Sequence, residues 1–253
     1  METYENFRTA LDEGVLTVTV DRPAVFNAMN AESVAELGRI VDAAEADPAV
    51  RVVILTGSGA KAFVAGADIA RMQAFGAFEA RAFMLAGQQV LFRIEKSAKP
   101  YIAAINGYAL GGGLEIAMAC DLRYAADSAS MGQPEIFLGI TPGWGGTQRL
   151  TRLVGKGLAK EIVFTGERIS AQRAFEIGLV NRVFPREQLQ DEVRNVARKL
   201  ALQPRDTLAM IKHAVEVGYD MSNTDANLFE TAICGLCFGQ DEQREGMRKF
   251  LKK

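Results

Sequence analysis

At 253 residues this chain can bury a large core as one domain, with or without an appendage, and its 49% hydrophobic and 24% charged residues are ordinary for a soluble globular protein. Because 29 Lys and Arg face 31 Asp and Glu, no global positive field would collect nucleic acid or an anionic membrane surface. No apolar run approaches the ~20 residues that a membrane-spanning helix needs, so we expect neither partner.

The first 55 residues indicate a layered α/β domain. Residues 14–20 (GVLTVTV) alternate as a strand does and end at a turn around Pro23. Residues 31–46 carry apolar side chains at helical spacing and end before Pro48, and 50–55 is a buried strand candidate. A strand, helix, strand order of this kind predicts parallel pairing.

The next segment, 56–72 (TGSGAKAFVAGADIARM), allows two interpretations. Gly57, Gly59 and Ala62 nearly match a dinucleotide-binding loop, but the loop follows an inner strand and its helix starts late, at Asp68. The favoured interpretation is a loop across the end of the sheet, with Asp68 as the helix N-cap and Gly66 and Ala67 presenting backbone N–H groups just before it.

Residues 103–115 (AAINGYALGGGLE) form the most unusual stretch. Three consecutive glycines, Gly111 to Gly113, are costly inside regular structure and indicate a need for bare backbone. They can leave N–H donors free where a helix begins, at about Leu114, which favours negative charge nearby. Glu115 falls in the first turn as a candidate acid or base. A glycine-rich turn with a Glu that only complements the helix dipole is the alternative.

Residues 129–155 supply a second carboxylate. Glu135 follows Pro134 and precedes an apolar segment, and the stretch from Pro142 to Gly146 builds a structured loop. An exposed Glu after a proline is the alternative. The remaining predicted elements are a helix over 77–97, strands over 101–105 and 120–126, and, from about Glu187, a helical appendage broken at Pro204, 218–223 and Gly239.

Cysteine and histidine usage excludes several classes. Cys120, Cys234 and Cys237 make no disulfide framework, and the last two form a C-x-x-C on one face of an apolar helix, where burial is a better interpretation than redox or metal chemistry. His213 is expected at a surface or interface, so a histidine-based hydrolase is poorly supported. The polar start METYENFRTALDEG lacks the order of a secretory signal. We expect a cytoplasmic protein, although a form processed in the mitochondrial matrix would look the same.

Several segments in order resemble the crotonase, or enoyl-CoA hydratase, family: AFVAGADI at 62–69, INGYALGGGLEIAMACD at 105–121, GQPEIFLGITPGWGGTQRLTRLVG at 132–155 and the tail QREGMRKFLKK at 243–253. The resemblance implies an α/β spiral of strand-strand-helix turns over 1–190, which would bind and transform an acyl-coenzyme A thioester. It implies a C-terminal helical trimerisation region over 191–253 and a trimer, or a hexamer built as a dimer of trimers. It implies no metal and no cofactor beyond the coenzyme A of the substrate.

The resemblance also assigns chemistry. It implies that the N–H groups of Ala67 and Gly112 bind the thioester oxygen, whose negative charge grows as water adds to the double bond. It implies that Glu115 activates the water and Glu135 protonates the α carbon, a coupled pair. Both glutamates together favour a hydratase, a hydro-lyase that makes 3-hydroxyacyl-CoA. The alternatives are an enoyl-CoA isomerase or another family reaction, and a member that only binds acyl-CoA or RNA.

The resemblance further implies a substrate-binding set, with one departure. Many hydratases have a Lys two residues after the aspartate of AGAD, where this chain has Ala70, so phosphate contacts would come from Arg22, Arg71 or the C-terminal lysines. Trp144 stands where the family often has a small residue; it either packs the loop or shortens the acyl pocket to favour a four-carbon substrate such as crotonyl-CoA. The predicted substrate-binding residues are Ala24, Phe26, Ala65, Gly66, Asp68, Ile69, Gly111, Pro134, Gly143, Trp144, Phe250 and Lys253.

Overall fold

The computed structural model describes residues 3–252, and its frame is a pair of β-sheets. In spatial order the larger sheet contains β1 (Phe7–Asp12), β2 (Val15–Val20), β3 (Val52–Gly57), β5 (Tyr101–Ile105), β7 (Leu122–Ala126) and β10 (Arg182–Phe184). β1 and β2 form an antiparallel hairpin, and every later pair of neighbours is parallel. The strands predicted over 14–20, 50–55, 101–105 and 120–126 are confirmed.

The apolar run of β5 explains its place at the centre of the larger sheet. All of its residues, YIAAI, are fully buried, as expected for a parallel strand that is covered on both faces. β3 is buried along its whole length for the same reason. The core therefore lies around these two strands. The chain leaves the larger sheet at their ends.

The smaller sheet arises because each central strand is followed at once by a short one. It contains, in spatial order, β4 (Ala62–Val64), β6 (Tyr108–Leu110), β8 (Ser130–Gly132) and β9 (Ile169–Ser170). The pairs β3 and β4, β5 and β6, and β7 and β8 each place one strand in each sheet, and β4, β6 and β8 are parallel. This repetition is the predicted spiral of strand-strand-helix turns.

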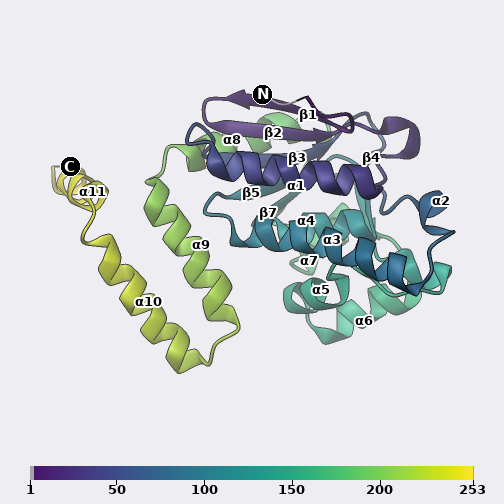
Figure 1. Cartoon of the computed structure of the whole chain (residues 1–253). Helices are drawn as coiled ribbons and strands as arrows, with labels where there is room; N and C mark the ends of the chain where they lie inside the picture. The colour runs from purple at the N-terminus through teal and green to yellow at the C-terminus, as the bar shows by residue number, and fades with distance from the viewer. Residues whose placement is uncertain (1–2, 253) are drawn as a thin grey trace.

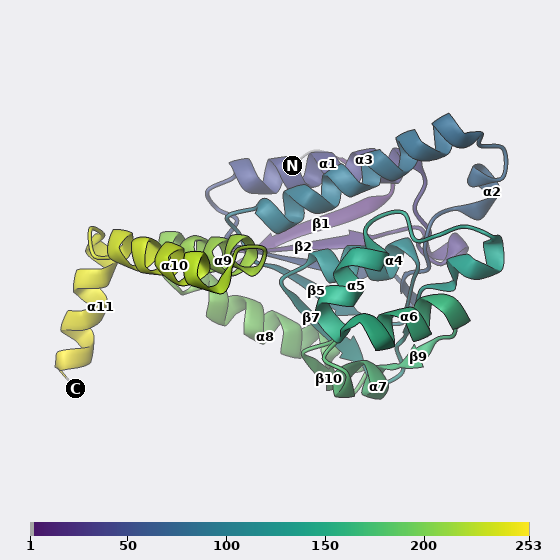
Figure 2. The same ribbon diagram turned by 90° about the horizontal axis from the view of Figure 1, so that it is seen from below.

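Helices cover the larger sheet on both faces. α1 (Ala31–Ala46) and α3 (Ala77–Lys96) lie side by side on one face, and α8 (Leu189–Ala201) lies on the other (Figure 2). Asn30 is the N-cap residue of α1: its side chain accepts from Ser33 N while the Ser33 hydroxyl accepts from Asn30 N, a capping box. The helices predicted over 31–46 and 77–97 are confirmed.

The other helical elements of the core are shorter than α1 and α3. α4 follows β6 directly and is buried along its whole length between the sheets, which explains its apolar sequence GGLEIAMA. It begins two residues earlier than predicted, at Gly112. These elements are the 3-10 turns η1 (Pro23–Val25) and η2 (Pro134–Leu138) and the helices α2 (Ile69–Met72), α4 (Gly112–Ala119), α5 (Gly146–Val154), α6 (Lys156–Thr165) and α7 (Ala171–Glu176).

A helical arm projects from this core (Figure 1). It consists of α9 (Arg205–Tyr219), α10 (Asn223–Cys237) and α11 (Asp241–Leu251), and none of the three has a buried residue. Lys212 fixes α9 to the core, because its Nζ donates to the carbonyls of Ile94 and Lys99 and to Asp121 Oδ2 at 2.9 to 3.0 Å. α8 falls almost entirely within the predicted region 191–253, yet its apolar side chains pack on the sheet. The projecting part is therefore α9 to α11.

Two sequence expectations concern this arm. Cys234 is exposed and Cys237 is half-buried, so the predicted burial of the C-x-x-C pair is wrong for Cys234 in the single chain, where α10 has no buried residue. His213 is exposed on α9, as predicted, with its ring 5.6 Å from that of Phe229. Between residues 3 and 252, no helix is both long enough and apolar enough to cross a membrane.

Candidate active site

The glycine cluster places Glu115 in the interior. Gly111 joins β6 to α4 with φ of +51°, a left-handed value that favours glycine, and a Cβ on it would lie 2.9 Å from Glu135 Oε1. The bare backbone therefore lets the second carboxylate approach the start of α4. One turn into the helix, Glu115 is 2% exposed. The sequence predicted that this turn needs bare backbone. In the structure, the Glu135 carboxylate occupies the space that a Cβ at Gly111 would take.

Two backbone N–H groups hold the Glu115 carboxylate. Its Oε1 accepts from Trp144 N at 2.8 Å and from Gly146 N at 2.6 Å. Gly146 is the first residue of α5, so its N–H has no partner within the helix and is free to donate. The loop from Pro142 to Gly146, which the sequence predicted only as structured, therefore positions the first carboxylate. Its glycines allow the close approach: a Cβ on Gly146 would lie 2.9 Å from Glu115 Oε1.

Glu135 approaches the start of α4 from another element. It is held by Gln133, a residue that the sequence analysis missed. It sits in η2 and is 8% exposed, which rules out the alternative of an exposed glutamate. Gln133 is fully buried, and with its amide nitrogen turned toward the carboxylate it donates to both Glu135 oxygens at 2.9 and 3.1 Å. The available signal was its place two residues before Glu135, directly after β8.

Burial makes both carboxyl groups weak acids. The pKa of Glu115 rises to about 7, chiefly because burial disfavours the charged form; the charge of Glu135 adds to the rise, and the N–H groups of Gly146 and Trp144 oppose it. Burial likewise raises the pKa of Glu135 to about 7. Near neutral pH the pair can hold one proton between them, so one group can serve as base and the other as acid.

These shifts predict a pH dependence of stability. A carboxyl whose folded-state pKa is raised stabilises the fold below its ordinary pKa near 4.5, and this contribution is lost as pH rises through about 7. Glu135→Gln removes that titration, so the variant should lose about 1 to 3 kcal/mol less stability than wild type between pH 5 and pH 8. Urea unfolding at both pH values measures the difference.

The matched control for that comparison is Glu161→Gln on the exposed face of α6. It should follow the pH dependence of wild type. Parallel stability curves for wild type and Glu135→Gln would contradict the raised pKa of Glu135.

Two backbone N–H groups belong to residues beside the carboxylates. Met29 and Ala67 form a parallel bridge in which Met29 N donates to Gly66 O and Asp68 N donates to Met29 O. Because N–H directions alternate along an extended chain, the N–H of Ala67 points away from Met29. Gly112, as the first residue of α4, also has no partner within the helix. Within residues 3–252, neither N–H has a hydrogen-bond acceptor. Each of the two glycine-rich segments therefore leaves one backbone N–H unpaired, at the residues that the resemblance proposed as donors.

A cavity of about 70 Å³ joins these groups. Ala67, Gly112, Glu115 and Glu135 all line it, so the structure brings the four predicted catalytic residues together. Side chains of Met72, Met84, Leu138 and Ile140 supply an apolar wall that the sequence analysis did not identify. The predicted substrate-binding residues that also line it are Ala65, Gly66, Ile69, Gly111, Pro134, Gly143 and Trp144.

Trp144 closes the cavity on one side and is buried to 2% exposure. A Cβ on Gly87 of α3 would lie 2.2 Å from the indole Nε1, and one on Gly112 would lie 2.8 Å from Cζ3. The indole therefore fills a slot that exists because these two positions are glycine. Its Nε1 has no hydrogen-bond partner among the described residues, so the ring is held by packing rather than by a hydrogen bond.

Other predicted residues lie outside the cavity. Ala24 and Phe26 belong to the exposed turn at η1, where Lys61 Nζ lies 5.6 Å from the Phe26 ring. Asp68 is the N-cap residue of α2, but its side chain makes no capping bond and instead lies 3.5 Å from Arg22 Nη2, which corrects the predicted cap. Arg22 also donates to the Ala28 carbonyl, so its guanidinium is engaged within the fold.

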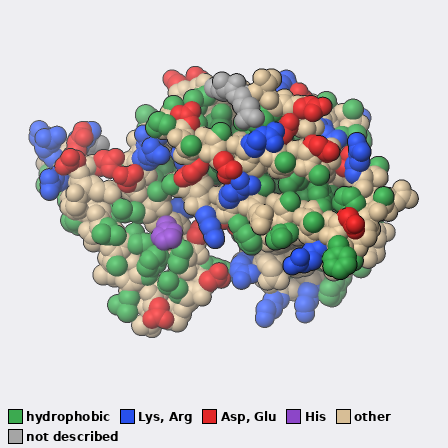
Figure 3. All heavy atoms as spheres, in the orientation of Figure 1, with side chains coloured by type: hydrophobic (Ala, Val, Ile, Leu, Met, Phe, Trp, Pro, Cys, Tyr) green, Lys and Arg blue, Asp and Glu red, His purple; other side chains and the backbone are tan. Residues whose placement is uncertain are grey.

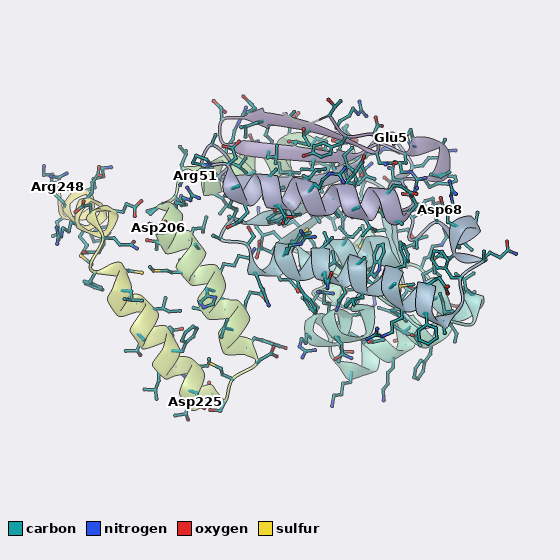
Figure 4. All side chains as sticks on the ribbon, viewed as in Figure 1. Glu5, Arg51, Asp68, Asp206, Asp225 and Arg248 are labelled. Atoms are coloured by element: carbon teal, nitrogen blue, oxygen red, sulfur yellow. The ribbon has the colours of Figure 1, made fainter. Side chains whose placement is uncertain are left out.

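The C-terminal residues lie at the far end of the arm. Phe250 is on α11 and is 78% exposed, and Arg248 beside it is on the opposite side of the molecule from Asp68 (Figure 4). The structure therefore does not bring Phe250 to the cavity of its own chain. Lys253 lies outside the described residues.

The dinucleotide interpretation loses its support in this geometry. Gly57 N already donates to Asn106 Oδ1 at 3.1 Å, so it is not free to bind a phosphate. A Cβ on Gly57 would lie 2.2 Å from Ala62 O and 2.4 Å from Phe63 O. The glycine at this position is needed because β4 crosses close to β3.

Two buried carboxylates beside unpaired N–H groups, on a spiral of this topology, form an arrangement that can combine acid–base catalysis with stabilisation of an oxyanion. The chain belongs to the enoyl-CoA hydratase/isomerase family, whose sequence model matches residues 10–253. It is 47% identical over 250 residues to the crotonyl-CoA hydratase of Syntrophomonas wolfei, a match that covers 99% of this chain and 96% of that protein.

Further relatives agree in sequence and in structure. The short-chain-enoyl-CoA hydratase of Clostridium acetobutylicum is 44% identical, over 94% of this chain and 92% of that protein. The crystal structure of enoyl-CoA hydratase from Bacillus anthracis matches with a TM-score of 0.95 and 36% identity, over 98% of this chain and 96% of that one. The predicted crotonase-like fold is confirmed.

Proposed function

We propose that this chain is a short-chain enoyl-CoA hydratase, which reversibly adds water to a trans-2-enoyl-CoA to give a 3-hydroxyacyl-CoA. The observation that carries the proposal is the pair of buried carboxylates facing a small cavity that also contains two unpaired N–H groups. The names of the relatives from Syntrophomonas wolfei and Clostridium acetobutylicum support the substrate class. Loss of the ultraviolet absorbance of a conjugated enoyl thioester tests it.

The N–H groups of Ala67 and Gly112 bind the thioester oxygen in this account. As water adds to the β carbon, electrons move through the conjugated system onto that oxygen, and fixed donors stabilise the charge as it develops. Each donor of this kind contributes roughly 100- to 1000-fold in rate, or about 3 to 4 kcal/mol. The position of Gly112 at the start of α4 adds the favourable end of a helix dipole.

The two carboxylates move the protons. Ionised Glu115 accepts a proton from the water while the water oxygen bonds to the β carbon. Protonated Glu135 donates its proton to the α carbon. One C–O and one C–H bond form while the C=C π bond is consumed, so no redox or metal cofactor is required, and coenzyme A enters as part of the substrate. The N–H groups that hold Glu115 Oε1 leave its other oxygen, Oε2, for the water.

Retention of both glutamates favours hydration over isomerisation. An isomerase moves a proton between two carbons of the substrate, which one carboxylate can accomplish, and needs no second group to activate water. Here both carboxyl groups are buried and have a raised pKa, and both are held by donors. An enzyme that performed only the isomerisation would bear the free-energy cost of burying a second carboxylate without using it.

Trp144 limits the acyl chain in this proposal. A cavity of about 70 Å³ suits a short acyl group, and the indole occupies the slot between α3 and α4 into which a longer chain would extend. Trp144→Ala should therefore lower the preference for a four-carbon over a ten-carbon enoyl-CoA, measured as the ratio of kcat/KM values, by at least about tenfold. That factor corresponds to about 1.4 kcal/mol, within the 1 to 3 kcal/mol by which a methylene group changes binding in an apolar pocket.

Trp144→Phe is the matched variant because it keeps an aromatic ring in the slot. It should change the length preference less than Trp144→Ala does. If both variants fold and keep the wild-type preference, Trp144 only packs the loop.

The arm suggests how chains assemble. We propose a homo-oligomer, either a trimer or a hexamer, in which the arm packs on a neighbouring chain. Figure 3 shows apolar side chains over the arm, and the exposed ones on α9 and α10 include Ile211, Val215, Leu228 and Leu236. Such assembly would bring Phe250 and Lys252 to the coenzyme A of a neighbour, since they do not reach the cavity of their own chain.

The proposed location is the cytoplasm, with no nucleic-acid or membrane partner. The mitochondrial matrix is the alternative, because a relative from Pongo abelii, 42% identical over 93% of this chain, is named a mitochondrial enoyl-CoA hydratase.

A further inference from the structure

Behind the loop that holds Glu115 lies an ion pair between Arg149 of α5 and Glu95 of α3. Arg149 Nε and Nη2 donate to the two Glu95 carboxylate oxygens at 2.5 and 2.8 Å, a bidentate geometry that fixes the plane of the guanidinium. The side chain of Arg149 is 9% exposed, and that of Glu95 is 24% exposed. Gln88 Oε1 accepts a further bond from Nη1 at 3.2 Å.

This guanidinium reaches the backbone of the catalytic loop. Arg149 Nη1 donates to Trp144 O at 2.6 Å. That carbonyl lies between the two N–H groups, those of Trp144 and Gly146, that donate to Glu115 Oε1. Segment 144–146 is thus bonded on one side to Glu115 and on the other to Arg149. One Cα separates the carbonyl from each flanking N–H group, so a shift of the carbonyl displaces those groups unless φ and ψ at Trp144 and Gly145 rotate to compensate.

The sequence leaves room for this contact at a cost. Gly145 has φ of +93°, and a Cβ on it would lie 2.1 Å from Arg149 Nη1. Burying an ion pair also gives little net stability, because desolvation offsets much of the attraction, and apolar residues of similar volume often stabilise as well or better. Stability alone therefore does not explain why a left-handed glycine and a buried ion pair occur at the same point. A requirement to fix the position of the loop does explain it.

We propose that Arg149, oriented by Glu95, is a positioning residue that sets the geometry of the N–H groups holding Glu115 and so controls its work as a base. The inference rests on the proposed hydratase function. Arg149 does not line the catalytic cavity and acts only through segment 144–146. Its positive charge also favours the ionised form of Glu115, which needs that form to accept a proton.

Other charged groups surround the pair and belong in any account of its pH dependence. Arg149 and Glu95 line a second cavity of about 450 Å³ between the core and α9. Arg152 of α5 and Glu216 and Asp220 of α9 also line it. Variants of Arg149 and Glu95 should therefore be compared with wild type at the same ionic strength.

The test compares Arg149→Met, Arg149→Lys and Glu95→Gln with Arg93→Met. Arg93 is the matched control because it lies on α3 close to Glu95 and pairs with Asp42 at 2.6 Å on the exposed surface, away from the catalytic loop. For each, kcat, KM for crotonyl-CoA, the pH profile of kcat/KM and the thermal midpoint are measured. Wild-type hydration is measured first, so that failure of the proposed function is distinguished from failure of this inference.

Arg149→Met should lower kcat by about 10- to 100-fold with KM changed less than threefold, since misplacement of a catalytic group by about 1 Å can cost that much. The acid limb of its pH profile should move to higher pH, because Glu115 loses donors and a nearby positive charge. Arg149→Lys, which keeps the charge without the fork, should have an intermediate kcat. A double variant with Glu95→Gln should lose little more than Arg149→Met alone, because the two act as one unit.

Arg93→Met should match wild type in kcat, in KM and in its pH profile. A folded Arg149→Met with kcat within twofold of wild type, or with a reduced kcat and an unmoved acid limb, would overturn the proposal. If Arg149→Met does not fold, Arg149→Lys and Glu95→Gln decide the question by the same criteria.

Discussion

Glu115→Gln and Glu135→Gln should each lower the kcat for hydration of crotonyl-CoA by about 100- to 10,000-fold, the range that a general acid or base contributes. Glutamine keeps the shape of the side chain and can still accept from Trp144 N and Gly146 N, so the loop around position 115 should persist. It can neither accept a proton from water nor deliver one to carbon. Stopped-flow absorbance with saturating substrate measures the change.

Both variants should bind the thioester with nearly the affinity of wild type, because the donors at Ala67 and Gly112 are unchanged. Binding of a saturated acyl-CoA, measured by calorimetry, supplies that control. Glu161→Gln, on the exposed face of α6, should retain wild-type kcat. A Glu135→Gln variant that hydrates at more than about a tenth of the wild-type rate would show that Glu135 is not the acid.

Gly113→Ala should destabilise the fold by about 1 to 3 kcal/mol and also lower kcat by about 100-fold. A Cβ at this position would lie 1.9 Å from Val64 O and 2.7 Å from Val64 C. Because these are backbone atoms, β4 must move away from α4. Three residues beyond Val64 the chain presents the N–H of Ala67, so the displacement should misplace one of the two oxyanion donors. Urea unfolding and steady-state kinetics measure the two effects.

Gly157→Ala in α6 is the matched control, since a Cβ there meets nothing within 4 Å. Alanine is preferred to glycine in a helix by roughly 0.5 to 1 kcal/mol, so this variant should be as stable as wild type or slightly more stable, with kcat unchanged. Wild-type stability and activity in Gly113→Ala would show that β4 and α4 can separate without cost, contrary to the packing described above.

Local patterns identified the elements that carry their own signal. The alternation in 14–20, the helical spacing in 31–46 and the apolar run YIAAI each define one element, and the order of these elements predicts a parallel sheet. The glycines before Glu115 and the proline before Glu135 mark both carboxylates. The start of α4 was placed too late, because helix propensity treats Gly112 and Gly113 as poor helix residues, whereas close packing against β4 and Trp144 requires them there.

Contacts between distant residues left no local signal. Gln133 bonds to Glu135 only after β8 and η2 fold, and Glu95 meets Arg149 across 54 positions of the chain. Asp68 has the residue type and position of an N-cap, but the fold places Arg22 beside it, and the ion pair takes the side chain. Phe250 was predicted at the site from resemblance, but the arm carries α11 away from the cavity of its own chain (Figure 4).

The most direct test of the hydratase function follows the ultraviolet absorbance of crotonyl-CoA after addition of the purified protein, with Glu115→Gln and Glu135→Gln alongside. The account predicts rapid loss of the conjugated absorbance by wild type, a product heavier by one water, no release of free thiol, and near-complete loss of activity in both variants. A folded wild type that binds crotonyl-CoA but leaves its absorbance unchanged, or that releases free thiol as the absorbance falls, would contradict hydration and indicate another reaction of the family.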